Sequence, residues 1–232
     1  MARIELLHGS EKIIRIPKYS LGRRNNDYGR GFYCTRDFDL AGEWACKKNT
    51  NGFINKYELD DAGLCVLDLG DGNHTVIEWI SILLQNRSFR INNPLAYQAK
   101  EYLVKNYAPK TKGIDIIIGY RADDSYFQYA EAFVENALPL RSLAKALKLG
   151  KLGLQTVLVS KKAFDQIEFK ESVAVNAEDY YPKFSSRDMD ARKEYLKIMS
   201  KEKRIADDIF VVDILREEMK ADDPRIQRII CE

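Results

Sequence analysis

Residues 4–10 read Ile-Glu-Leu-Leu-His-Gly-Ser, and residues 29–35 read Gly-Arg-Gly-Phe-Tyr-Cys-Thr. The first stretch predicts a strand over Ile4 to Leu7 that ends in a turn at His8-Gly9-Ser10, because an apolar run meets a glycine and a serine. The second predicts a short strand after an exposed polar loop from Pro17 to Arg30. A third strand is expected where Gln155 precedes Thr156-Val157-Leu158-Val159, which is rich in β-branched side chains. These three strands are the framework for the rest of the fold.

Apolar periodicity along the remaining chain alternates between helices and strands. Helices are expected near residues 38–45, 75–84, 94–107, 123–137, 141–148 and 163, and further strands at 53–59, 64–69, 114–118 and 167–175, with 64–69 beside 53–59. After residue 176 the strand patterns stop, and helices are expected at 189–201, at 207–220 and after Asp223-Pro224. The sequence therefore predicts an α+β fold, with a mixed domain over residues 1–175 and a helical C-terminal extension over residues 176–232.

The charge of the 232 residues is close to balanced, since 37 basic minus 35 acidic side chains give +2. No net field draws the chain to nucleic acid or to an anionic membrane, and neither is expected as a partner. The longest apolar runs fall far short of the ~20 residues that span a bilayer. Residues Met1 to His8 carry charges within a short apolar stretch, which indicates a first strand rather than a secretion signal.

Cysteine and histidine are too sparse for a metal centre or a dense disulfide framework. The cysteines are far apart without a CxxC pair, and there are two histidines: Cys34, Cys46, Cys65, Cys231, His8 and His74. A metal site would have to rest mainly on carboxylates, so no metal is expected. The default location is a reducing cytoplasm, with export by a route that lacks a Sec-type signal left open.

Taken in order, the segments Leu7 to Ser10, Gly29 to Thr35 and Gln155 to Val159 resemble the ADP-ribosyltransferase fold, in its diphtheria-toxin and poly-ADP-ribose-polymerase branch. With Tyr120-Arg121-Ala122-Asp123-Asp124 between them, the chain looks like an uncharacterised bacterial family distantly related to those transferases. The resemblance covers about residues 3–175. It implies a split β-sheet core with surrounding helices, and NAD as the substrate.

The resemblance also implies roles for individual residues. The branch carries a histidine on the first strand, a tyrosine on a following strand and usually a glutamate opening a later strand, and His8, Tyr33 and Gln155 take these catalytic places. His8 would bond a ribose hydroxyl, the Gly9 backbone would hold the nicotinamide amide, and Tyr33, Phe32 or Tyr28 would stack on the nicotinamide ring. The implied NAD-binding set is His8, Gly9, Ser10, Gly31, Phe32, Tyr33, Thr35 and Asp123.

Gln155 departs from that pattern, because an amide cannot supply the negative charge of a glutamate. Loss of one preorganised electrostatic contact raises a barrier by about 2.7–4 kcal/mol. Asp123 or Asp124 is the expected compensating carboxylate, although with Ser125 they also make a good helix N-cap, which is the simpler interpretation. Gln155 is equally consistent with an ordinary polar residue at a strand entrance, and His8 with a strand-end histidine bonded to a loop.

These expectations lead to an NAD-dependent mono-ADP-ribosyltransferase that cleaves the nicotinamide–ribose bond through an oxocarbenium-like state and modifies a protein acceptor. The acceptor side chain stays open, because Gly153 stands two places before Gln155, where many arginine-specific enzymes carry a second glutamate. The alternative is a non-catalytic NAD-binding or protein-interaction module on the same fold. A third interpretation gives the helical extension the main role, in docking a partner or covering the cleft.

Overall fold

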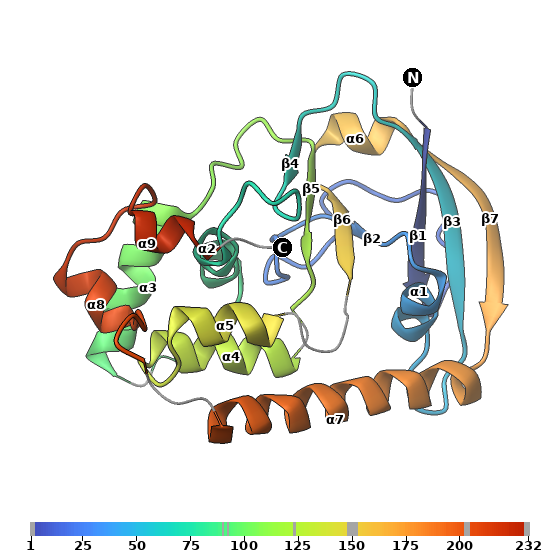
Figure 1. Ribbon diagram of the computed structural model, residues 1–232. Coiled ribbons are helices and arrows are strands. Elements are labelled where there is room, and N and C mark those ends of the chain that lie inside the picture. The colour runs from blue at the N-terminus through green and yellow to red at the C-terminus, as the bar shows by residue number, and fades with distance from the viewer. Residues whose placement is uncertain are drawn as a thin grey trace.

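Two β-sheets stand at the centre of the computed structural model, which describes residues 3–89, 91, 93–122, 124–147, 153–201 and 205–229. Figure 1 shows a three-stranded sheet at one end, a four-stranded sheet in the middle and a group of helices at the other end. The protein is thus a mixed α+β structure, which confirms the predicted fold class at this level.

The three-stranded sheet is antiparallel and has the order β1-β3-β7. Its strands are β1 (Arg3–Ser10), β3 (Gly52–Asp60) and β7 (Ile167–Val175). The expected turn at His8-Gly9-Ser10 is wrong, because these residues stay in β1 and pair with Phe53, Ile54 and Asn55 of β3. Helix α1 (Phe38–Ala45) packs on β1 and β3, and it begins at an N-cap where Asp37 accepts from the Leu40 N–H at 3.0 Å.

The four-stranded sheet has the order β2-β6-β5-β4. Its strands are β2 (Phe32–Cys34), β6 (Leu154–Leu158), β5 (Ile116–Tyr120) and β4 (Val66–Asp68). The expectation that residues 64–69 lie beside residues 53–59 is wrong, since β4 pairs with β5 in parallel. This partner lies 50 residues further along the chain, and no local pattern reports such a pairing. The two sheets meet at a bridge in which Leu7 and Thr35 exchange backbone hydrogen bonds of 2.8 Å.

Helices cover the four-stranded sheet and enclose the largest hydrophobic core. They are α2 (Val76–Asn86), α3 (Pro94–Tyr107), α4 (Asp124–Val134) and α5 (Leu140–Leu147), with the short α6 (Lys161–Asp165) after β6. The predicted capping box opens α2, where Glu78 accepts from the Thr75 N–H at 2.6 Å and from its hydroxyl at 3.0 Å. Trp79 of α2 is fully buried, so this amphipathic helix anchors the core.

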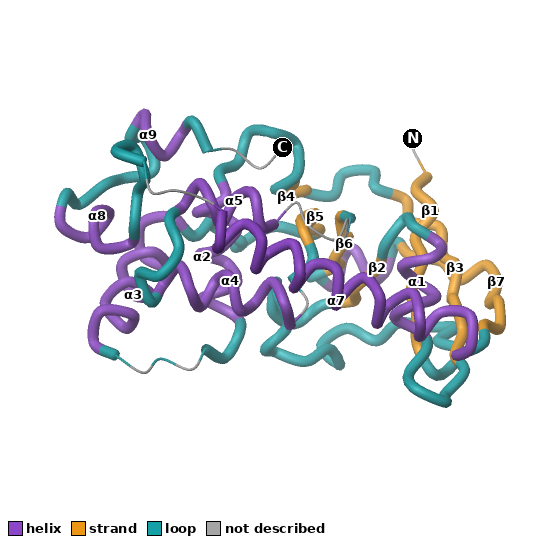
Figure 2. Tube along the Cα trace, turned by 60° about the horizontal axis from the view of Figure 1, so that its bottom comes forward, coloured by secondary structure: helices purple, strands orange, loops and turns teal. Residues whose placement is uncertain are grey.

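The C-terminal part contains α7 (Ala177–Lys201), α8 (Val211–Arg216) and α9 (Pro224–Gln227). Helix α7 begins at Ala177 rather than near residue 189, because Tyr180 packs on Gly42 of α1, where a Cβ would lie 2.2 Å from the tyrosine ring. Figure 2 shows α7 running from α1 to α4 and α5. None of the helices in the described ranges is long and apolar enough to cross a membrane.

Candidate functional site

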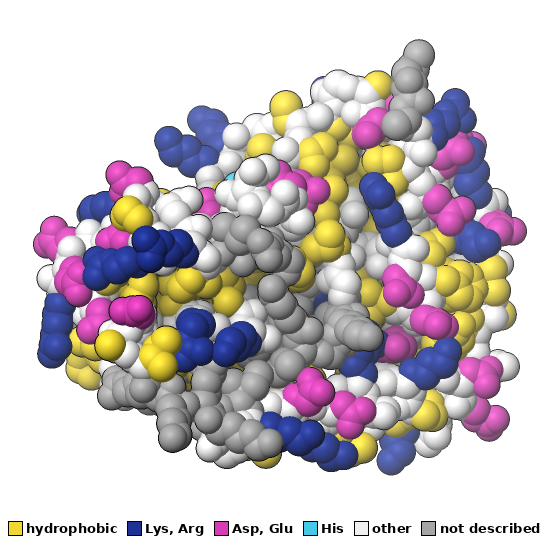
Figure 3. Space-filling model, in the orientation of Figure 1, with side chains coloured by type: hydrophobic (Ala, Val, Ile, Leu, Met, Phe, Trp, Pro, Cys, Tyr) yellow, Lys and Arg dark blue, Asp and Glu magenta, His cyan; other side chains and the backbone are white. Residues whose placement is uncertain are grey.

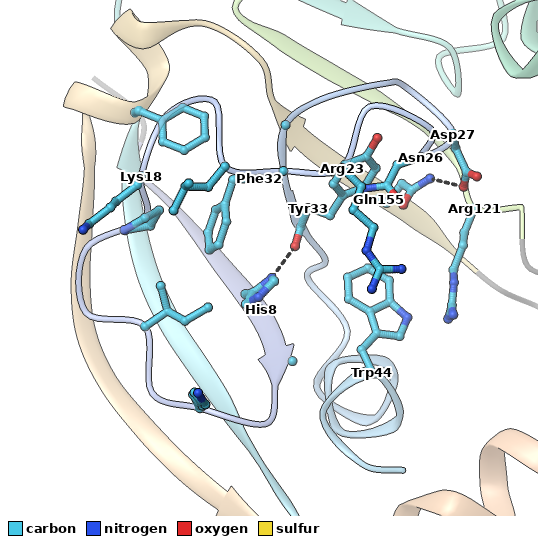
Figure 4. Close-up of a pocket in the computed structure, with 18 of the residues that line it drawn as sticks. His8, Lys18, Arg23, Asn26, Asp27, Phe32, Tyr33, Trp44, Arg121 and Gln155 are labelled. Atoms are coloured by element: carbon cyan, nitrogen blue, oxygen red, sulfur yellow. Dashed lines mark hydrogen bonds between the residues drawn. The ribbon is translucent and has the colours of Figure 1, made fainter. Parts of the chain in front are cut away.

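A large cleft opens between the end of β1, the loop of residues 11–31, β2 and the start of β6. Its volume is about 1250 Å³, above the roughly 300–1,000 Å³ of ordinary small-molecule pockets. Helix α7 contributes Phe184, Asp188 and Arg192 to its wall, so the C-terminal extension takes part in the site. In Figure 4, Lys18 stands at one end of the cleft, Arg121 at the other, and His8, Phe32, Tyr33 and Gln155 lie between them.

His8 lies in the cleft at the end of β1, with its ring 4.4 Å from the ring of Phe32. Its Nδ1 is 2.7 Å from the Tyr33 carbonyl oxygen (Figure 4). A carbonyl only accepts, so Nδ1 carries the proton and Nε2 keeps its lone pair in the neutral ring. Burial lowers the pKa of His8, against a smaller rise from the Tyr33 carbonyl, and the ring is therefore neutral at pH 7. His8 is thus an acceptor that faces a ligand-sized space.

Tyr33 presents its ring to the cleft while its hydroxyl is engaged in the loop. That hydroxyl donates to the Gly29 carbonyl at 2.7 Å and accepts from the Tyr28 N–H at 3.1 Å. Burial raises the pKa of Tyr33, so the phenol stays protonated. The ring remains available for stacking, whereas the oxygen is not available as a base.

Gln155 is the second residue of β6, lies deep in the cleft and is 3% exposed. Its Nε2 donates to Asp27 Oδ2 at 3.0 Å (Figure 4) and to the Tyr120 carbonyl at 3.3 Å. The same Oδ2 accepts from the Ala122 N–H at 2.9 Å, and Asp27 Oδ1 lies 3.4 Å from Nε of Arg87. Burial raises the pKa of Asp27, while the Ala122 N–H, Arg87, Gln155 and Arg121 oppose that rise. The carboxylate beside Gln155 is therefore Asp27, which the sequence analysis missed.

The two glycines assigned to the site are explained by packing. A Cβ on Gly9 would lie 1.9 Å from the Ala41 carbonyl oxygen and 2.7 Å from the Ala45 nitrogen, both in the backbone of α1. A Cβ on Gly31 would lie 2.5 Å from a Val157 methyl carbon. Both residues line the cleft, but the close approach of their own scaffold already requires that they have no side chain.

Two residues of the expected NAD-binding set do not line the cleft, and a third lies outside the described residues. The Ser10 hydroxyl donates to the Lys12 carbonyl at 2.7 Å and accepts from Asn55 at 3.0 Å, so it shapes the following loop. Thr35 is buried and accepts from the Asp37 N–H at 3.1 Å, just before α1. Asp123 is the residue outside the described ranges.

The cleft wall is rich in positive charge, with seven Lys and Arg side chains against two Asp. Arg121 lies over the ring of Trp44, with 5.1 Å between the guanidinium carbon and the ring centroid. The indole Nε1 of Trp44 is buried and has no hydrogen-bond partner among the described residues. Figure 3 shows basic and acidic side chains interspersed over the face of the molecule that it presents. Such a wall suits a phosphate-bearing ligand.

Within the described ranges, no three His, Cys, Asp or Glu side chains converge as they would around a metal ion. The loop residues that shape the cleft carried little signal in the sequence, because polar turn formers follow no helix or strand period. The sequence did draw attention to Arg121, because it belongs to the segment Tyr120 to Asp124 that contributes to the resemblance.

Comparison with known proteins gives one match. The family described as "Protein of unknown function (DUF3990)" matches residues 4–169, which include both sheets apart from Arg3 of β1 and the last six residues of β7. No curated protein matches the chain. No solved structure matches it either.

Proposed function

The chain belongs to the family of proteins of unknown function described as DUF3990, and we propose that it is an NAD-dependent mono-ADP-ribosyltransferase with a protein acceptor. The observation that carries this proposal is the convergence of His8, Tyr33 and Gln155 on one cleft from three separate strands. The resemblance selected these residues by motif order alone. A split-sheet core of the ADP-ribosyltransferase type is part of the proposal, supported by two separate sheets that meet at the Leu7–Thr35 bridge.

The residues present fit NAD in size, charge and hydrogen-bonding groups. The cleft exceeds the volume of ordinary small-molecule pockets, as an extended dinucleotide requires. Arg and Lys side chains on its wall suit a diphosphate, which guanidinium groups bind through paired hydrogen bonds. The buried indole N–H of Trp44 is a further donor that a ligand oxygen would satisfy.

Each of the three residues would have a defined part in binding. Neutral His8 would accept from a ribose hydroxyl through Nε2, because its Nδ1 proton is committed to Tyr33. Tyr33 and Phe32 would provide aromatic surface for the nicotinamide ring. Gln155 would orient the sugar that reacts, and Asp27 beside it brings negative charge toward the position where positive charge develops.

The reaction needs precise placement more than covalent help from the protein. The nicotinamide nitrogen leaves with the electron pair of its bond to ribose, and a nucleophilic atom of the acceptor bonds the same carbon and loses a proton. A rigid cleft that fixes the sugar and excludes water favours the acceptor over hydrolysis. Gly153 is exposed two places before Gln155, so acceptor choice must come from other residues.

Transfer of label from a biotinylated NAD analogue to lysate proteins tests the proposal. We expect labelling by the wild type and its loss in His8→Ala and Gln155→Ala. The matched controls are His74→Ala at the start of α2 and Gln98→Ala on the exposed face of α3, and both should label as the wild type does. If the wild type labels nothing but binds NAD in calorimetric titration, the non-catalytic NAD-binding or protein-interaction module replaces the enzyme. Absence of both labelling and binding refutes the proposal.

A further inference from the structure

The hydrogen-bond partners of Gln155 decide which end of its amide faces the cleft. Oxygen and nitrogen of a glutamine side chain are told apart by what surrounds them. Here Nε2 meets Asp27 Oδ2 at 3.0 Å and the Tyr120 carbonyl at 3.3 Å. A carboxylate and a carbonyl can only accept, so both amide protons are committed to them.

Burial raises the pKa of Asp27, but the groups that contact its carboxyl oxygens favour the carboxylate form. The Ala122 N–H donates to Oδ2 at 2.9 Å, and Arg87 Nε lies 3.4 Å from Oδ1. Arg87 also donates to the Ala122 carbonyl at 3.3 Å, which holds the guanidinium beside the carboxylate. The groups in these contacts are hydrogen-bond donors or a cation. A proton on the Asp27 carboxyl would point at one of them, which is unfavourable.

We infer that Asp27 is the positioning residue of the site: it holds the Gln155 amide so that Oε1 alone is offered to the ligand, where it accepts from a ribose hydroxyl. In this arrangement Gln155 offers an oriented acceptor to the ribose where a glutamate would offer a charged one. The negative charge is on Asp27, which is hydrogen-bonded to the far side of the Gln155 amide. This inference deepens the proposed function and rests on it. The sequence led us to expect that glutamine at position 155 weakens the site compared with glutamate. The inference reverses this expectation, because a glutamate at position 155 would face Asp27 as a second carboxylate.

The orientation itself is measured without NAD, by hydrogen exchange of side-chain amides in the full chain labelled with ¹⁵N-glutamine. The Gln155 resonance is assigned by its absence in Gln155→Met. We expect its amide protons to exchange at least about tenfold more slowly than those of exposed Gln98, as one retained hydrogen bond allows. Asp27→Ala should remove most of that protection. Exchange as fast as that of Gln98 in the wild type, or unchanged protection in a folded Asp27→Ala protein, overturns the inference.

A second experiment measures the coupling between the two residues through NAD affinity. Gln155→Glu should bind NAD at least about tenfold more weakly than the wild type, because two carboxylates would share the 3.0 Å contact. The pair Gln155→Glu with Asp27→Asn should regain at least about tenfold over Gln155→Glu alone. Gln98→Glu is the matched control and should leave the affinity unchanged. Independent structural damage would add rather than cancel, so this recovery separates positioning from scaffolding.

The two experiments separate the possible failures. If Gln155→Glu binds NAD as well as the wild type, or the double variant binds no better than Gln155→Glu, the inference is wrong while the proposed function stands. If the wild type binds no NAD, the proposed function fails, and amide exchange still decides whether Asp27 orients Gln155. The coupling experiment also covers the case in which Asp27→Ala does not fold.

Discussion

Replacement of Gly9 by alanine should destabilise the protein through packing, whatever ligand the cleft holds. The new Cβ would stand 1.9 Å from the Ala41 carbonyl oxygen and 2.7 Å from the Ala45 nitrogen. Neither atom can rotate away, because both belong to the backbone of α1, so the helix must shift relative to β1. Overpacking of this kind costs about 1–3 kcal/mol, and a backbone clash belongs at the upper end. Relief of glycine's chain entropy returns only about 0.5–1 kcal/mol.

The net expectation is a loss of about 2 kcal/mol in the free energy of unfolding, measured from urea denaturation followed by circular dichroism. Gly70→Ala is the matched control, because its Cβ would come closest to the side-chain tip of Leu154, which is 39% exposed and free to move, and would meet Asp68 Oδ1 at an ordinary contact distance of 3.5 Å. Its effect should stay within about 0.5 kcal/mol, as for ordinary surface changes. A Gly9→Ala protein as stable as the wild type would refute the packing argument and return Gly9 to a role in ligand binding alone.

Three further variants test charges and hydrogen bonds around the site. Burial lowers the pKa of His8 below the ordinary histidine value of 6.5, so at acidic pH the unfolded chain binds a proton that the folded chain does not. The free energy of unfolding should therefore fall as the pH is lowered from about 7.5 to about 5. His8→Gln should reduce this dependence when denaturation is measured at a series of pH values. Arg187→Met leaves the buried Glu43 carboxylate uncompensated between α1 and α7 and should cost about 3–5 kcal/mol. The matched control, exposed Lys183→Met, should change the free energy of unfolding much less. Tyr33→Phe leaves a loop carbonyl and an amide without their partner and should cost about 1–3 kcal/mol in the same measurement.

Local signals predicted the elements well where they are complete within one segment. The capping box at Thr75 and Glu78 opens α2 as expected, and the helix predicted to start at Pro94 does so, capped by Asn93 at 2.8 Å from the Ala96 nitrogen. Predictions were wrong where the local structure depends on residues that are far away in the sequence. The turn expected at residues 8–10 is strand because β3 pairs with it, and α7 starts early because Tyr180 finds a place on α1.

Some residues of the site could be predicted from the motifs, and others could be recognised only in the folded structure. Motif order identified His8, Tyr33 and Gln155, all of which line the cleft, but it selected Ser10 and Thr35 as well, which hold loop and helix ends. In a polar loop between two strands, a functional carboxylate has the same surroundings in sequence as a turn former. Asp27 could therefore be identified only from its contacts in the structure.

The loop that supplies Asp27 is held in shape by Asn55, a fully buried residue of β3. Its Nδ2 donates to the His8 carbonyl, the Ser10 hydroxyl and the Lys12 carbonyl, and its Oδ1 accepts from the Ile14 N–H at 2.9 Å. A buried amide whose groups are all satisfied fixes one arrangement, because each alternative leaves a polar atom unpaired. The first half of the loop is thus fastened to β3, which pairs with the strand that carries His8. The second half is fastened by Tyr33 and by the contact of Asp27 with Gln155, so hydrogen bonds within the chain hold both halves of the loop that lines the cleft.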